Sequence, residues 1–164
     1  MPPGEPVRVV YTCYGGTHSS PVAAAIHLGR LPRRRVPSAA QLLATPWFDQ
    51  VDGKARGRLM LAGIDRRGNP VYVLGRGSLS LAVVRNTVQS TLAMAGQAHL
   101  PVLLVDTLAC VSGLMRVGGF LSRGLGLIAL GRPLVILGTR RVYPRLVRLV
   151  EQVEALLARP PDAR

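Results

Sequence analysis

The chain has 164 residues, of which 48% are hydrophobic and only 4% aromatic, and it carries a formal net charge of +13. This length suits one domain with a core of Leu, Val, Ile and Ala, and two cysteines are too few for a disulfide framework. Charged residues or prolines interrupt every apolar run, and the first residues lack the apolar segment of a signal peptide. We therefore expect a cytoplasmic protein with no membrane partner.

Short apolar runs alternate with helical patterns along the chain. The patterns predict strands at 7–13, 59–64, 71–74, 101–105 and 133–137, and helices at 20–28, 38–44, 78–95, 111–130 and 142–158. The turn-forming residues 65–70 join the second and third strands into a hairpin.

Strands that alternate with helices favour a mostly parallel sheet covered on both faces. The sequence thus predicts a single α/β domain over residues 1–164, a three-layer α/β/α sandwich. Its sheet has about five strands, mostly parallel, with one antiparallel hairpin. The segments 1–6 and 159–164 are expected to be flexible tails.

Polar loops follow the predicted strands, and the carboxyl ends of parallel strands are where open α/β sheets bind ligands. Glycine lets backbone N–H groups approach an anion, hydroxyl groups donate hydrogen bonds to it, and arginine forms a bidentate pair with it. The predicted anion-binding residues are Gly15, Gly16, Thr17, His18, Ser19, Ser20, Arg76 and Arg140. The pattern contains no metal-ligand spacing and no cofactor motif.

The first of these loops begins with a thiol, Cys13, and leads into a helix. The positive end of the helix dipole and the loop N–H groups favour a thiolate and would also hold the oxygens of a phosphoryl group. Cys13 is therefore a candidate nucleophile for phosphoryl transfer, with Ser20 holding the thiolate and Asp106 as candidate general acid. The alternatives are that Cys13 is an apolar residue ending a buried strand and that Asp106 caps the next helix.

The run from Cys13 to Ala25 resembles the catalytic loop of low-molecular-weight protein tyrosine phosphatases and related arsenate reductases. The resemblance implies a phosphatase-like or flavodoxin-like fold, with Cys13 as the nucleophile and Ser20-Pro21 as the helix start. The phosphate-clamping arginine of that family falls on Ser19. A clamp would then have to come from elsewhere, the candidates being Arg76, Arg116, Arg123 and Arg140. The loop is also similar to the phosphocysteine loop of sugar phosphotransferase IIB subunits, which works without that arginine.

A longer resemblance spans nearly the whole chain. The segments CYGGTHSSPVAAAIHLGRLP, PWFDQV, GNPVYVLGRG and GGFLSRGLGLIALGRPLVILGT are similar to domain-of-unknown-function family 3189, an uncharacterised bacterial family best known from spore-forming Firmicutes. This resemblance implies a bacterial cytosolic protein and no particular activity.

These observations favour a protein that binds a phosphate or phosphoester, either a phosphate-containing small molecule or a phosphoprotein, and that acts as a cysteine-dependent phosphatase or phosphocarrier. A second hypothesis is a non-enzymatic module, linked to sporulation, that senses an anion or nucleotide through the same loop. A third is nucleic-acid binding through the basic surface. The scattered arginines, the single lysine and the scarcity of aromatic residues argue against it.

Three other features of the sequence have two interpretations each. Cys110 could form a redox pair with Cys13 or be an inert buried thiol. Trp47 and Phe48 could line a substrate pocket or pack in the core. The glycine-spaced stretch 118–131 could form a homo-oligomer contact or pack closely against the sheet. We expect Asp49 and Asp52 to be solvated and His27 to lie on a helix face.

Overall fold

The computed structural model describes residues 5–50 and 53–159. Its sheet has four strands in the order β2-β3-β1-β4, formed by β1 (Arg8–Cys13), β2 (Leu59–Ile64), β3 (Pro70–Gly75) and β4 (Val102–Asp106). The central strand β1 pairs in parallel with β3 and β4, whereas β2 pairs antiparallel with β3. The predicted parallel sheet with one antiparallel hairpin is therefore confirmed.

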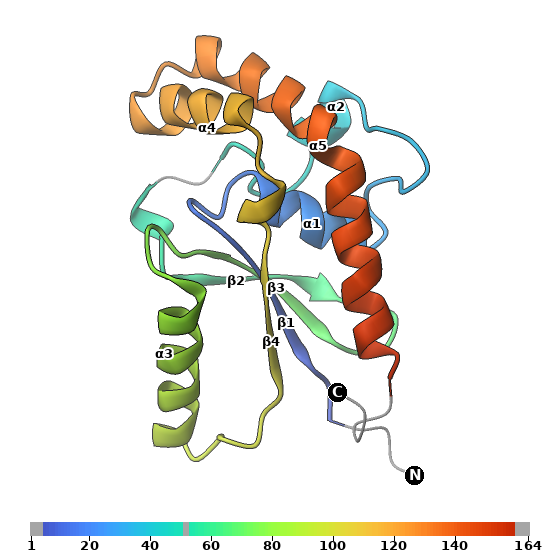
Figure 1. The fold of residues 1–164 in the computed structure, drawn as a ribbon, viewed down its shortest axis with the longest axis vertical. Helices are drawn as coiled ribbons and strands as arrows, with labels where there is room; N and C mark the ends of the chain where they lie inside the picture. Colours follow the sequence, from blue (N-terminus) through green and yellow to red (C-terminus); the bar gives the residue numbers. More distant parts are fainter. Residues whose placement is uncertain (1–4, 51–52, 160–164) are drawn as a thin grey trace.

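Helices cover both faces of the sheet, as Figure 1 shows. On one face lie α1 (Ser19–His27) and the second half of α5 (Ile128–Leu157), which bury the strand side chains that alternate as Val9, Tyr11 and Val71, Val73. On the other face α3 (Leu81–Met94) buries Val84 against Val10 and Leu74. Successive strand side chains point to opposite faces, so the two cores follow directly from the sequence alternation. The structure is the predicted three-layer α/β/α sandwich.

The predicted fifth strand, 133–137, is wrong. These residues lie inside α5, which continues through Pro133 and Pro144. A five-residue apolar run fits a buried strand or one stretch of a buried helix equally well, and a proline within it argues for a helix break. The tertiary contacts favour the helix, because Val135 is fully buried and Gly131 and Gly138 face α4.

The predicted helix 111–130 is divided into shorter pieces. A short 3₁₀ turn (Leu108–Cys110) follows β4, then α4 (Gly113–Gly119), then a π-helical turn, η3 (Phe120–Gly124). These pieces pack beside the first half of α5, above the carboxyl ends of the strands in Figure 1. We call residues 108–124 the cap.

Glycines allow this close packing of cap and α5. A Cβ on Gly131 would lie 2.4 Å from the backbone nitrogen of Ser122, and one on Gly118 would lie 2.7 Å from that of Val135. Gly118 and Gly131 therefore serve packing between α4, η3 and α5, and not packing against the sheet.

The second predicted helix agrees with the structure, and a short turn that was not predicted precedes β2. The helix predicted at 38–44 is α2 (Ala39–Leu43), and Ser38 caps it by accepting from the backbone N–H of Gln41 while the Gln41 side chain accepts from that of Ser38. A 3₁₀ turn, η1 (Gly53–Ala55), precedes β2. Among the described helices, none is both long and apolar enough to cross a membrane.

Candidate functional site

The loop between β1 and α1 rests on the end of β3, and two glycines make this possible. Gly16 has φ +71°, and a Cβ there would lie 2.8 Å from the backbone nitrogen of Gly75. Conversely, a Cβ on Gly75 would lie 2.6 Å from the carbonyl carbon of Gly15. The backbone N–H of Arg76 donates to the carbonyl oxygen of Cys13 at 2.9 Å. The loop is thereby held at the carboxyl end of the sheet.

The sulfur of Cys13 accepts two hydrogen bonds within this loop. The backbone N–H of Gly16 donates to Sγ at 3.1 Å, and the Ser20 hydroxyl donates to Sγ at 3.0 Å. Cys13 is buried, but it also lines a pocket. Both contacts place hydrogen-bond donors on the sulfur.

The first turn of α1 contributes further polar groups. The helix begins at Ser19, one residue before the predicted start, and His18 is its N-cap residue. Ser19 Oγ lies 2.8 Å from Thr107 Oγ1, which donates to the carbonyl oxygen of Thr12 at 2.8 Å. Thr107 Oγ1 is therefore left to accept from Ser19. Within the described chain, the backbone N–H groups of Gly15, His18, Ser19 and Ser20 have no protein acceptor.

A pocket of about 690 Å³ opens over this loop. From the loop it is lined by Cys13, Tyr14, Gly15, Thr17, His18 and Ser19, and from the cap by Leu108, Val111, Met115, Arg116, Gly119, Phe120, Arg123 and Gly124. Arg56, Arg76, Gly77 and Ser78 complete the wall. The described lining thus includes four arginines and no carboxylate, so the pocket suits an anion.

Arg76 is fixed in this wall by two contacts. One of its terminal nitrogens donates to Asp106 Oδ2 at 2.9 Å, and the other donates to the carbonyl oxygen of Leu79. Its side chain is only 10% exposed. The Nε atom is buried and has no hydrogen-bond partner among the described residues. A buried unpaired donor is costly.

Asp106 does not line the pocket. Its Oδ2 holds Arg76, and its Oδ1 accepts from the backbone N–H of Leu108 at 2.9 Å. Asp106 is not the N-cap residue of the following 3₁₀ turn, which is Thr107, but its Oδ1 accepts from the first residue of that turn.

The largest departure from the sequence-based expectation is Asp49. It is fully buried, with φ 52°, although we expected it to be solvated. Its Oδ1 accepts from Ser122 Oγ at 2.8 Å and Arg123 Nε at 2.9 Å, and its Oδ2 accepts from Arg132 Nε at 2.8 Å. Asp52, which we also expected to be solvated, lies outside the described residues.

Burial alone raises the pKa of Asp49. The hydrogen bonds from His18, Arg132, Arg123 and Ser122 outweigh that effect and hold its pKa well below the ordinary value. No sequence pattern predicts this role, because His18 lies 31 residues away, Ser122, Arg123 and Arg132 lie more than seventy residues away, and only the fold brings them together.

His18 connects this carboxylate to the pocket. Its Nε2 lies 3.3 Å from Asp49 Oδ1, and its ring meets Phe48 edge-on, with centroids 5.9 Å apart. An ionised Asp49 can only accept, so Nε2 carries the proton and Nδ1 is free to accept or, when protonated, to donate. A Cβ on Gly119 would lie 3.2 Å from Nδ1, so the ring edge faces the pocket-lining segment of the cap.

The other candidates lie apart from this pocket. Arg140 follows no strand; it is exposed on α5 and does not line the pocket. Cys110 is a free, buried thiol, and burial raises its pKa, as expected of an inert cysteine. Phe48 is fully buried, and Trp47 packs against the same core, so this pair serves packing.

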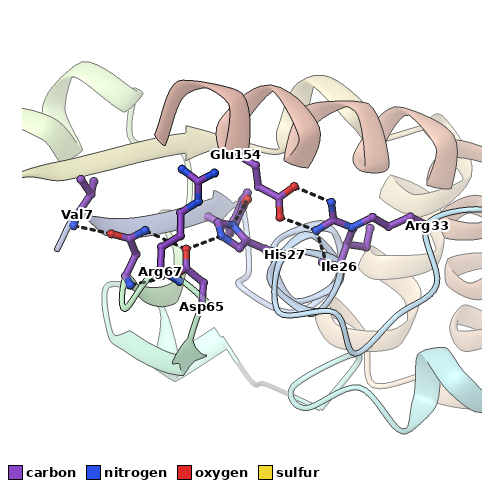
Figure 2. Close-up of polar contacts among 9 residues, drawn as sticks. Val7, Ile26, His27, Arg33, Asp65, Arg67 and Glu154 are labelled. Atoms are coloured by element: carbon purple, nitrogen blue, oxygen red, sulfur yellow. Dashed lines mark hydrogen bonds and ion pairs between the residues drawn. The ribbon is translucent and has the colours of Figure 1, made fainter. Parts of the chain in front are cut away.

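A second polar cluster lies at the amino ends of the strands and was not expected from the sequence. His27, expected on a helix face, is buried: its Nδ1 lies 2.8 Å from the Tyr11 hydroxyl and its Nε2 lies 3.1 Å from Asp65 Oδ2. Figure 2 shows this His27–Asp65 contact beside the Arg33–Glu154 ion pair, which joins the loop after α1 to α5.

This cluster fastens the hairpin to the rest of the fold. Burial tends to raise the pKa of Asp65, but hydrogen bonds from Asn69, the backbone of Arg67 and His27 lower it overall. Asn69 in turn accepts from the backbone N–H of Val7 at 2.9 Å. The contacts satisfy one another, so the cluster is structural.

A family model described as "Protein of unknown function (DUF3189)" matches residues 8–155. The search of curated proteins and the search of solved structures found no match.

Proposed function

The chain belongs to the DUF3189 family, whose description names no activity, and we propose from the site itself that the protein binds the phosphate group of a phosphomonoester over the Cys13 loop. One observation carries the proposal. The Cys13 sulfur accepts from the Gly16 N–H and the Ser20 hydroxyl in the wall of a pocket that four arginines line. Donors that hold a thiolate are the groups that also hold phosphoryl oxygens.

Arg76 is the best candidate for the clamp that Ser19 does not supply. It lines the pocket, and its Nε has no partner among the described residues. Two other clamp candidates line the pocket from the cap: Arg123, which is held by Asp49, and Arg116. Arg140 does not line the pocket and cannot supply the clamp there.

The arrangement supports cysteine-dependent phosphoryl transfer. The Cys13 thiolate attacks phosphorus, so that an S–P bond forms while the P–O bond to the leaving group breaks and the leaving oxygen takes up a proton. Water then attacks the thiophosphate, the S–P bond breaks, and inorganic phosphate and the thiolate are released. Backbone N–H groups at the start of α1 stabilise the equatorial oxygens.

His18 is better placed than Asp106 to give the leaving oxygen its proton. It lines the pocket, whereas Asp106 is occupied by Arg76 and the backbone N–H of Leu108. In its protonated form His18 holds Asp49 through Nε2 and can donate from Nδ1.

The test is hydrolysis of p-nitrophenyl phosphate by the wild type, Cys13→Ser and Cys110→Ser, with inorganic phosphate binding measured alongside by calorimetry. We expect activity in the wild type and in Cys110→Ser, and none in Cys13→Ser. Phosphate binding without turnover would favour the non-enzymatic sensing hypothesis. Absence of both turnover and phosphate binding would overturn the proposal.

A further inference from the structure

The two exposed aromatic side chains of this protein lie in the same pocket. The chain has one Trp, four Tyr and two Phe. Tyr14 is 50% exposed and Phe120 is 61% exposed, whereas the other five are buried or half-buried. Both exposed rings line the pocket over the Cys13 loop, one from the loop and one from the cap. Isolated exposed apolar residues are ordinary, but two rings at one pocket provide a surface for a flat ligand.

Each ring is supported by a neighbour. The guanidinium of Arg56 lies over the Tyr14 ring, 5.3 Å from its centroid. The Tyr14 backbone is anchored because its carbonyl oxygen accepts from the N–H of Gly77 at 2.8 Å. Phe120 packs on Gly124, where a Cβ would lie 3.0 Å from Phe120 Cδ2. The rings are therefore positioned beforehand, which lowers the entropic cost of stacking a ligand on them.

The charges around these rings exceed what one phosphoryl group needs. Arg76 and Arg123 are paired with Asp106 and Asp49. Within the described chain, Arg56 and Arg116 line the same pocket and have no carboxylate partner. A ligand that joins a flat ring to a strongly anionic group satisfies both features at once.

We propose that the pocket takes a nucleotide, with its base against Tyr14 and Phe120 and its phosphate over the Cys13 loop. This inference rests on the proposed phosphate site and adds the class of the group attached to the phosphate. A cavity of about 690 Å³ lies in the range that holds molecules of this size, whereas a simple aryl phosphate would leave much of it empty. Ser78 adds to the lining a hydroxyl group that suits a ribose.

The test is calorimetric titration with AMP, GMP, ribose 5-phosphate, phenyl phosphate and inorganic phosphate. All proteins carry Cys13→Ser, so that turnover does not consume the probe, and circular dichroism checks their fold. The ring variants are Tyr14→Leu and Phe120→Leu. The matched control is Leu125→Ala, an exposed apolar residue that does not line the pocket.

We expect at least one nucleotide to bind about tenfold or more tightly than ribose 5-phosphate, because stacking on aromatic side chains contributes on that scale. Tyr14→Leu and Phe120→Leu should each weaken nucleotide binding by about tenfold and leave inorganic phosphate binding unchanged, and Leu125→Ala should alter neither.

Two results would overturn the inference: nucleotides that bind no more tightly than ribose 5-phosphate or phenyl phosphate, or ring variants that bind nucleotides as the parent does. Failure of the phosphate site has a different signature. Ribose 5-phosphate and inorganic phosphate would then not bind at all. If a nucleotide still bound, and Tyr14→Leu still weakened its binding, the stacking site at the two rings would be supported without the phosphate site.

Discussion

The buried carboxylate of Asp49 offers the sharpest test of how the cap is held over the loop, and Asp49→Asn is the change to make. Asn tolerates a positive φ as Asp does, so the backbone at φ 52° is not strained by the substitution. The variant therefore isolates the charge and the acceptors of this side chain.

The magnitude follows from the contacts. The amide oxygen of Asn can replace Oδ1 and keep the donors His18, Ser122 and Arg123, so the amide nitrogen then faces Arg132 Nε. The variant thus loses the hydrogen bond from Arg132, and a neutral amide replaces the carboxylate in the hydrogen bonds that remain. Arg132 is 38% exposed and can be resolvated, so its share is about 1 kcal/mol or less. A neutral amide also makes weaker buried hydrogen bonds with Arg123 and His18 than the carboxylate does. The total fall in the free energy of unfolding is therefore about 3 kcal/mol.

The assay is urea unfolding at pH 7, followed by circular dichroism. The matched control is Asp106→Asn, because the Asp106 carboxylate also pairs with an arginine but is 32% exposed, and we expect it to cost less than Asp49→Asn. If Asp49→Asn lay within about 1 kcal/mol of the wild type, the Asp49 contacts would not be what holds the cap, and our reasoning about this cluster would be wrong.

Three further predictions concern stability. The free energy of unfolding should fall as the pH drops below the ordinary carboxyl pKa of 3.8 towards the lower folded pKa of Asp49, since protonation is then favoured in the unfolded state; urea titrations at several pH values should show a shallower fall in Asp49→Asn. Gly131→Ala should lower Tm by several degrees because its Cβ would lie 2.4 Å from a backbone nitrogen, whereas Gly113→Ala, with nothing within 4 Å, should not; equal Tm values would contradict the close packing. Tyr11→Phe should cost about 1–3 kcal/mol in urea unfolding because it leaves the buried Nδ1 of His27 without its donor, and an unchanged midpoint would argue against that hydrogen bond.

Local patterns predicted most of the elements and the central part of the site. The β-branched run before Cys13 and the glycines, hydroxyl residues and proline after it indicated a strand, a tight loop and a helix, because each depends on neighbours a few residues away. The expectation that Ser20 contacts the Cys13 sulfur is confirmed by the 3.0 Å hydrogen bond. What this loop binds stays a prediction.

The composition and periodicity of the sequence determined the sandwich, the two core faces and the position of the thiol at the end of β1. Only the tertiary structure decided that 133–137 is helical, since the close packing of Gly118 on α4 and Ser122 on η3 against Gly131 on α5 outweighs a local pattern that fits a strand equally well. It likewise decided that Asp49 is buried and that Tyr14 and Phe120 share a pocket. The physical reason is the same in each case: the energies involved belong to contacts between residues far apart in the chain, which no local window contains.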